Sequence, residues 1–171
     1  EACYNFLPAI PPCICALPLQ QLVLDSNEIR EVPDFVAQLT GLTMLSLTNN
    51  SIRKISEVVP ARLTKLDRLL LQRNELMTLP PTLMALQALH TLDLSFNQLY
   101  ALPTGFAELS SLRILRLAYN DLEFASMTLD GMHELLELRL TSNRLAGIPH
   151  TFAALKKLEV FHIGGNIFPL E

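Results

Sequence analysis

The sequence predicts an elongated α/β solenoid made of stacked copies of one short unit. An eleven-residue pattern, L-x-x-L-x-L-x-x-N-x-L with other apolar residues at some leucine positions, starts at residues 19, 42, 66, 89, 112, 135 and 158. Its asparagines lie 23 or 24 residues apart, at Asn27, Asn50, Asn74, Asn97, Asn120, Asn143 and Asn166. A fixed period of this length indicates stacked units that each contact only their neighbours. We therefore expect one continuous domain of seven repeats over residues 19–171.

Each unit is expected to begin with a short strand. In residues 89–99, LHTLDLSFNQL, Leu92 and Leu94 alternate with polar residues, which is the period of a half-buried strand. Strands of successive units would stack side by side, about 4.8 Å apart, into one parallel sheet. One face of that sheet is then buried, and the other leaves the variable side chains free.

The asparagine stands where the chain must turn out of the strand. A turn inside a stack leaves backbone groups that cannot all reach water, and an unpaired buried polar group costs about 1–3 kcal/mol. The Asn side chain has two donors and an acceptor oxygen, enough to bond backbone in its own repeat and in the next one. The sequence therefore predicts a ladder of amides along the core.

After the asparagine the apolar spacing changes to steps of three and four, as in Leu99, Leu102, Phe106 and Leu109. This spacing predicts short helical, 3-10 or extended segments that return the chain along the outer side. Proline recurs in these segments and is tolerated at the start of a helical turn; the residues are Pro33, Pro80, Pro103 and Pro149.

Two outer segments depart from this pattern. One gains a residue and carries its proline at Pro60, and the other has Ala125 and Ser126 in place of the Leu-Pro pair. Phe124 and Met127 near the second departure form either an outer contact patch or side chains that refill local slack. We favour the second interpretation, because loops tolerate such changes.

Both ends of the chain are incomplete relative to the repeat. Residues 1–18 fit the second half of a truncated N-terminal repeat, with Asn5, Leu7, Ile10 and Pro11 at the expected spacing. The last residues follow an asparagine turn without a polar capping helix. Since solenoids need caps over their terminal core, we expect the chain to be a segment of a longer array.

The seven patterns, together with the outer segment L-P-x-x-[LF]-x-x-L-x-x-L, resemble the leucine-rich repeat family, and in particular the short 23-residue repeats of intracellular scaffold proteins. The resemblance covers essentially the whole chain. It implies a curved, horseshoe-like slab with a parallel inner β-sheet. It also implies a protein–protein interaction module in which the concave sheet binds a protein or peptide.

Composition excludes several other classes of protein. Half of the residues are apolar, which is ample for a continuous core, and no apolar run approaches the roughly 20 residues that cross a bilayer. The net charge of −4 argues against a protein that binds nucleic acid by neutralising phosphates. We expect neither a membrane span nor a nucleic-acid partner.

The chain lacks a recognisable catalytic or metal-binding pattern. Cys3, Cys13 and Cys15 are odd in number and lack the paired clusters of zinc sites, so we expect free thiols and a cytoplasmic protein, although a disulfide at that end stays possible. The histidines do not group with cysteines or carboxylates at ligand spacing. His162 alone falls on the solvent face of the predicted sheet. We therefore predict no enzyme, cofactor or metal.

The candidate binding residues are the variable ones on the exposed face of the sheet. Aromatic and apolar residues stand there among arginines, and such mixtures dominate protein interfaces. Asp93 and Arg116 are equally explained by pairing across strands. The partner-binding candidates are Arg68, Leu70, Arg73, Asp93, Phe96, Ile114, Arg116, Tyr119, Glu137 and Arg139.

These observations predict a non-catalytic scaffold or recognition module for a protein or peptide. Two alternatives remain. Because similar repeats occur beside kinase, GTPase or ubiquitin-ligase domains, the resemblance also allows a recognition or regulatory segment of a larger enzyme. The other alternative is an extracellular receptor ectodomain, which would require paired cysteine caps beyond these ends.

Overall fold

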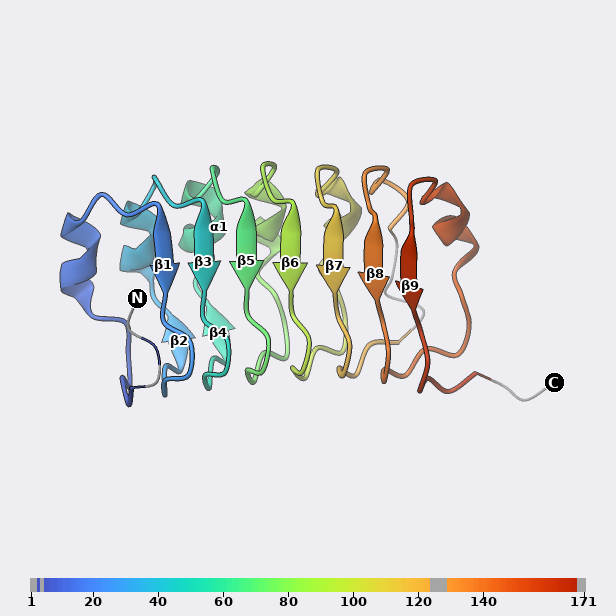
Figure 1. The fold of residues 1–171 in the computed structure, drawn as a ribbon, viewed down its shortest axis with the longest axis horizontal. Helices are drawn as coiled ribbons and strands as arrows, with labels where there is room; N and C mark the ends of the chain where they lie inside the picture. Colours follow the sequence, from blue (N-terminus) through green and yellow to red (C-terminus); the bar gives the residue numbers. More distant parts are fainter. Residues whose placement is uncertain (1–2, 4, 124–128, 169–171) are drawn as a thin grey trace.

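A computed structural model describes residue 3, residues 5–123 and residues 129–168. Seven strands form one parallel sheet in chain order, facing the viewer in Figure 1. They are β1 (Gln21–Val23), β3 (Met44–Ser46), β5 (Arg68–Leu70), β6 (Thr91–Asp93), β7 (Ile114–Arg116), β8 (Glu137–Arg139) and β9 (Val160–His162). Equivalent residues of successive repeats pair directly, as Leu69 does with Leu92 and Leu92 with Leu115. The predicted solenoid with a parallel inner sheet is confirmed.

Each three-residue strand turns its central side chain into the core. Leu92, Leu115 and Leu138 are fully buried, while the residues on either side of them point to the opposite face of the sheet. We call that solvent-facing side the inner face. The buried leucines belong to one hydrophobic core that runs through the array.

The outer segments form short 3-10 helices behind the sheet (Figure 1). The amide N–H of Val36 donates to the Pro33 carbonyl (3.1 Å), and that of Leu83 donates to the Pro80 carbonyl (2.9 Å). The proline therefore stands immediately before the helical turn. Proline has no N–H, and at this position the helix needs no hydrogen bond from one. The helices are η1 (Pro12–Ala16), η2 (Asp34–Gln38), η3 (Pro81–Ala85), η4 (Phe106–Glu108) and η6 (His150–Ala154).

The segment with the added residue contains the α-helix α1 (Val58–Arg62). The N–H of Leu63, which caps this helix, donates to the carbonyl of Val59, four residues earlier. In the neighbouring outer segments the corresponding hydrogen bond spans three residues. The extra residue thus widens a 3-10 turn into an α-turn. Nearby, β2 (Glu31–Val32) and β4 (Lys54–Ile55) pair in parallel as a small second sheet. The other departure, with the alternatives for Phe124 and Met127, lies outside the described residues.

The repeated asparagines bond the backbone of two repeats. The Asn97 Oδ1 accepts from the N–H of Leu76 (3.0 Å), and its Nδ2 donates to the carbonyls of Leu71 and Leu94 (both 3.0 Å). Equivalent bonds recur at Asn50, Asn74, Asn120, Asn143 and Asn166. The second repeat is the preceding one, not the following one as expected. The carbonyl in that preceding repeat also accepts from its own asparagine, as Leu71 does from Asn74 (3.0 Å), so neighbouring amides share one acceptor.

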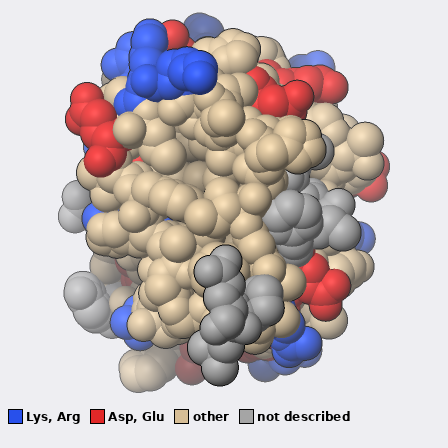
Figure 2. All heavy atoms as spheres, turned by 90° about the vertical axis from the view of Figure 1, so that its right-hand side faces the viewer, with Lys and Arg blue, Asp and Glu red and all other residues tan. Residues whose placement is uncertain are grey.

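The two ends of the described array differ. At the N-terminal end the N–H of Leu7 donates to Asn27 Oδ1 (3.1 Å), as in later repeats. Both β1 and β9 are edge strands, but beside β1 the core is covered by Leu7, Ile10 and Ile14, and Leu22 is buried. At the other end Phe161 and Ile163 are half-buried, where Leu138 and Leu140 are fully buried. Figure 2 looks onto this end, whose centre carries few acidic or basic side chains. None of the described helices is long and apolar enough to cross a bilayer.

Candidate functional site

A groove of about 490 Å³ crosses strands β6 to β9 on the inner face. On one side it is bounded by side chains from the turns that follow the strands, at the lower edge in Figure 1. Strand ends bound the other side. Its lining consists of Gln72, Arg73, Asp93, Ser95, Phe96, Arg116, Ala118, Tyr119, Arg139, Thr141 and His162.

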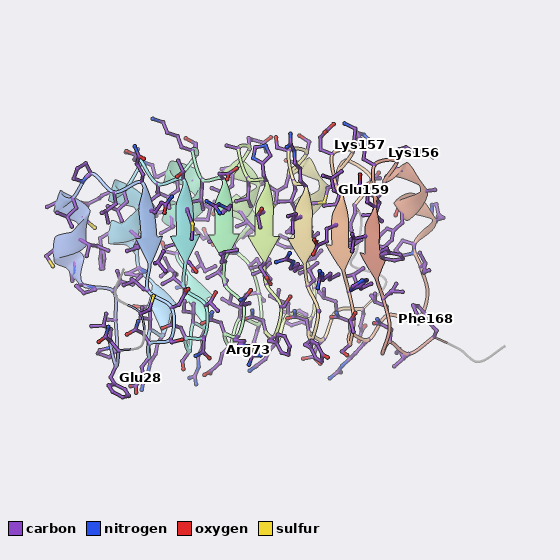
Figure 3. The ribbon with its side chains drawn as sticks, in the orientation of Figure 1. Glu28, Arg73, Lys156, Lys157, Glu159 and Phe168 are labelled. Carbon is purple, nitrogen blue, oxygen red and sulfur yellow. The ribbon has the colours of Figure 1, made fainter. Side chains whose placement is uncertain are left out.

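The turn side of the groove carries a stack of planar side chains from three successive repeats. The rings of Phe96 and Tyr119 lie nearly parallel, with centroids 4.3 Å apart and an interplanar angle of 9°. The guanidinium carbon of Arg73 lies 4.8 Å from the Phe96 centroid, and Figure 3 shows this arginine at the turn edge. The rings are 41% and 48% exposed. The stack is therefore continuous and open to solvent.

The backbone under this stack is left-handed. The residue before each repeated asparagine has positive φ, including 57° at Phe96 and 58° at Tyr119. Bulky side chains are uncommon in that conformation, whereas glycine and asparagine tolerate it. Other repeats place Asn49 or Gly165 there with φ of 56° and 69°. The turn therefore has no need of an aromatic residue, and the exposed rings call for an explanation at the surface.

The strand side of the groove carries a network of charged side chains. The Arg116 guanidinium lies 3.6 Å from the buried Asp93 carboxylate and donates to Glu137 (2.7 Å), which also accepts from Arg139 (2.6 Å). The hydrogen bond from Arg116 is the main cause that lowers the pKa of Glu137, and the same bond raises the pKa of Arg116. These side chains hold each other in place across β6, β7 and β8.

The groove is cationic although the chain is acidic. Arg73, Arg116 and Arg139 line it against a single lining carboxylate, Asp93, with Glu137 beside them, while the whole chain carries −4. Arg116 is shared by two carboxylates. Arg139 bonds through Nε, and no hydrogen bond reaches its two terminal nitrogens from the described residues. Those nitrogens are available to an incoming carboxylate.

Six of the ten candidate residues line the groove: Arg73, Asp93, Phe96, Arg116, Tyr119 and Arg139. Asp93 is only 3% exposed and accepts from the N–H of Ser95 (3.0 Å) as well as pairing with Arg116, so it supports the groove from beneath. The other four candidates lie on the same face outside the lining. Among these, Leu70 and Ile114 are half-buried, and Arg68 lies 3.7 Å from Asp67.

The residues that sequence reasoning missed share one position of the repeat. Gln72, Ser95, Ala118 and Thr141 each follow the third leucine of a pattern, and the positive-φ turn places them in the groove. Their signal was the same period that identified the neighbouring turn column. His162 also lines the groove, next to Arg139 in register.

Other reactive side chains lie apart from the groove. Cys3, Cys13 and Cys15 are free thiols. The Cys15 thiol donates to the Phe35 carbonyl (3.1 Å), and its pKa is raised, first by burial and then by Cys13. His90 pairs with Asp67 through Nδ1 (2.7 Å). Within residues 3, 5–123 and 129–168, no group of three or more metal-binding side chains comes together.

Comparison with known proteins agrees with this architecture. The family model described as "Leucine rich repeat" matches residues 18–76 and 65–122, together more than half of the chain. The chain belongs to the leucine-rich repeat family.

This leucine-rich repeat chain is 33% identical over 84 residues to a volume-regulated anion channel subunit of Rattus norvegicus, covering 48% of the chain and 10% of that protein. It is 35% identical over 89 residues to a probable inactive serine/threonine-protein kinase of Dictyostelium discoideum, covering 50% and 3%. It thus spans a tenth or less of either relative.

Solved leucine-rich repeat structures resemble it over most of its length. A leucine-rich repeat protein of Leptospira interrogans covers 100% of the chain, and the chain covers 55% of it, with a TM-score of 0.72 and 25% identity. A plant peptide hormone receptor in complex with RGF2 covers 92% of the chain, and the chain covers 26% of it, with a TM-score of 0.78 and 28% identity. An internalin from Listeria monocytogenes covers 90% of the chain, and the chain covers 50% of it, with a TM-score of 0.62 and 25% identity.

Proposed function

We propose that this leucine-rich repeat chain is a non-catalytic interaction module that binds a protein or peptide segment in the groove across β6 to β9. The observation that carries the proposal is the exposed Phe96–Tyr119 stack beside arginines. Aromatic and arginine side chains supply most of the energy of protein interfaces. Rings held at positions where the turn would accept smaller residues fit that role.

The size of the inner face is suitable for such a partner. Seven strands about 4.8 Å apart span roughly 30 Å, and a standard interface needs about 800 Å² on each side. The leucine-rich repeat fold supports protein interaction in general, and one structural neighbour is a receptor in complex with a peptide hormone. We extend that mode of binding to the groove of this chain.

A non-catalytic role is consistent with how the polar groups of the groove are used. Its lining carboxylate, Asp93, and the neighbouring Glu137 are both engaged in ion pairs with Arg116. Such pairing favours a fixed charge pattern for recognition over a side chain poised to react. We also place the protein in a reducing compartment, the cytoplasm, with its three free cysteines as support.

A second candidate function is recognition on behalf of a larger protein. The chain spans only 3% of its kinase-like relative and 10% of its channel-subunit relative. In that case the groove would recruit a substrate or restrain an activity located elsewhere. The binding chemistry of the groove is the same in both candidates.

Binding by the groove is tested with peptides selected from a random nine-residue display library on the purified chain. Calorimetry compares the wild type with the Phe96→Ala/Tyr119→Ala double variant. We expect at least tenfold weaker binding, since each ring stands where interface energy concentrates. The control is Tyr100→Ala, a tyrosine that is 53% exposed outside the groove lining. Equal affinity of the double variant and the wild type would place binding elsewhere.

A further inference from the structure

The stack on the turn side of the groove is open at one end. Arg73 covers one face of Phe96, and Phe96 covers one face of Tyr119. The same position in the next two repeats holds Ser142 and Gly165, which carry no ring. Successive strands lie about 4.8 Å apart, close to the 4.3 Å between the two rings. One more planar group therefore fits on Tyr119, above Ser142.

The groove floor beyond that position is open at Gly164, where an added Cβ meets no atom within 4 Å. At the turn itself Gly165 packs closely on Ser142, since a Cβ added to Gly165 would lie 3.0 Å from the Ser142 Oγ. Ser142 itself has a φ of 54°, the same left-handed backbone that supports Phe96 and Tyr119. The direction in which a side chain leaves the turn is thus the same at Ser142. What is missing there is a third ring, and an incoming ring can occupy its place.

Charge selects which planar group fits. Arg139 lies on β8, in the repeat that contains Ser142, and its side chain is 42% exposed with its terminal nitrogens unbonded among the described residues. His162 follows Arg139 in register on β9. An incoming guanidinium would meet the positive charge of Arg139 and be repelled. An aromatic side chain would not be repelled, and a carboxylate next to it in the partner would form a bidentate ion pair with Arg139.

We propose that the partner presents an aromatic side chain next to an acidic one, that its ring stacks on Tyr119 above Ser142, and that its carboxylate pairs with Arg139. This deepens the proposed function and rests on it. The partner is a protein segment of aromatic–acidic character. The ring supplies contact area and the carboxylate sets orientation along the groove.

A single-stranded nucleic acid also offers rings and negative charge, as stacked bases and phosphates. The three arginines in the groove outnumber the two carboxylates in and beside it, so the groove is cationic. Because the whole chain nevertheless carries a net charge of −4, the rest of the chain is anionic. A polyanion longer than the groove would be repelled by that surface. A short acidic peptide meets only the cationic groove, so the peptide is favoured.

The first experiment compares four probes at about 0.15 M salt, where surface charges are screened beyond roughly 8 Å. They are Gly/Ser-flanked peptides centred on Glu-Phe-Glu, Lys-Phe-Lys or Glu-Leu-Glu, and a mixed-sequence single-stranded oligonucleotide. We expect Glu-Phe-Glu to bind about fivefold or more tightly than Glu-Leu-Glu, in line with the stacking gain of an aromatic pair, and more tightly than Lys-Phe-Lys. Equal or absent binding of the three peptides overturns the proposal, as does tighter binding of the oligonucleotide.

The second experiment fills the open position with the chain's own ring. Ser142→Phe should continue the stack, keep the melting temperature of the wild type or raise it, and weaken Glu-Phe-Glu binding at least fivefold. Ser26→Phe, at the same turn position of the first full repeat, is the matched control and should leave binding unchanged. Arg139→Gln should remove the preference for Glu-Phe-Glu over Lys-Phe-Lys. Undiminished binding by Ser142→Phe, with normal unfolding, overturns the placement of the ring.

These outcomes separate the inference from the function on which it rests. If library-selected peptides lose affinity in the Phe96→Ala/Tyr119→Ala variant but Ser142→Phe and Arg139→Gln bind normally, the groove binds partners and the aromatic–acidic assignment is wrong. If the double variant binds normally as well, both are wrong.

Discussion

The same sheet has two unlike halves. At β1 and β3 the turn positions hold Ser26 and Asn49, whereas from β5 to β7 they hold Arg73, Phe96 and Tyr119. The backbone conformation is the same in both halves, since φ is 56° at Ser26 and 57° at Phe96. The repeated columns of leucine and asparagine build the solenoid in both halves. The variable columns are therefore free to carry recognition in one half without affecting the fold of the other.

The largest expected effect comes from breaking a repeated column. Asn97→Ala leaves the Leu76 N–H without its partner and removes one of the two amide hydrogen bonds to each of the Leu71 and Leu94 carbonyls, which still accept from Asn74 and Asn120. With about 1–3 kcal/mol for the unpaired N–H and about 0.5–1.5 kcal/mol for each of the two lost bonds, and with partial relaxation, we expect the free energy of unfolding to fall by about 2–4 kcal/mol. Urea unfolding followed by circular dichroism measures it. A loss below about 1 kcal/mol would show that the ladder is dispensable.

A smaller effect is expected from the charged network in the second half. Glu137→Gln removes a carboxylate that accepts from Arg116 and Arg139, and we expect a loss of about 1–2 kcal/mol at pH 7. Because the pKa of folded Glu137 is lowered, its stabilisation is complete above the ordinary value of about 4.3 and is lost as the pH falls through the lowered value.

The wild type and Glu137→Gln should therefore converge in unfolding free energy as the pH falls below about 4.3, the ordinary value for a glutamate, as measured by urea titrations at a series of pH values. Glu75→Gln is the matched control, since Glu75 forms an exposed pair with Arg53 (2.8 Å) for which about 0–1 kcal/mol is expected. A constant difference at all pH values would mean that Glu137 acts through packing and not through its charge.

The repeated columns could be predicted from the sequence because each position recurs seven times. The leucine period gave the sheet and its buried face, and the chemistry of the amide gave the ladder. The direction of the ladder could not be predicted, since an Asn side chain bonds either neighbouring repeat equally well on paper. The burial of Asp93 was missed because a carboxylate in a variable column looks exposed until Arg116 and the Ser95 N–H are seen to enclose it.

The candidate site was predicted only in part for a related reason. The outward positions of the strands and the position before each repeated asparagine were identified from the sequence. The position that follows the third leucine of each pattern was not, because its place in the groove depends on the left-handed turn; its residues are Gln72, Ser95, Ala118 and Thr141. The stacking of Phe96 on Tyr119 likewise depends on rotamers that no spacing specifies.

The smallest effect on stability is expected at the exposed rings. In Phe96→Asn and Tyr119→Asn, the lost stacking of about 0.5–1.5 kcal/mol is offset by a residue that tolerates positive φ. We expect unfolding free energies within about 0.5 kcal/mol of the wild type, measured by urea unfolding, together with weakened binding of library-selected peptides. Phe96 and Asn97 are adjacent, so loss of stability by Phe96→Asn equal to that of Asn97→Ala would erase the distinction between the two kinds of column.

Hydroxyl-radical footprinting of side chains, with the chain free and saturated with its tightest library-selected peptide, tests most directly whether recognition is confined to the groove half of the sheet. Phe96 and Tyr119 should become protected, while Met77 and Tyr100, which are 55% and 53% exposed outside the groove lining, should react as before. Protection of Met77 or Tyr100 with unchanged oxidation of Phe96 and Tyr119 would contradict the account.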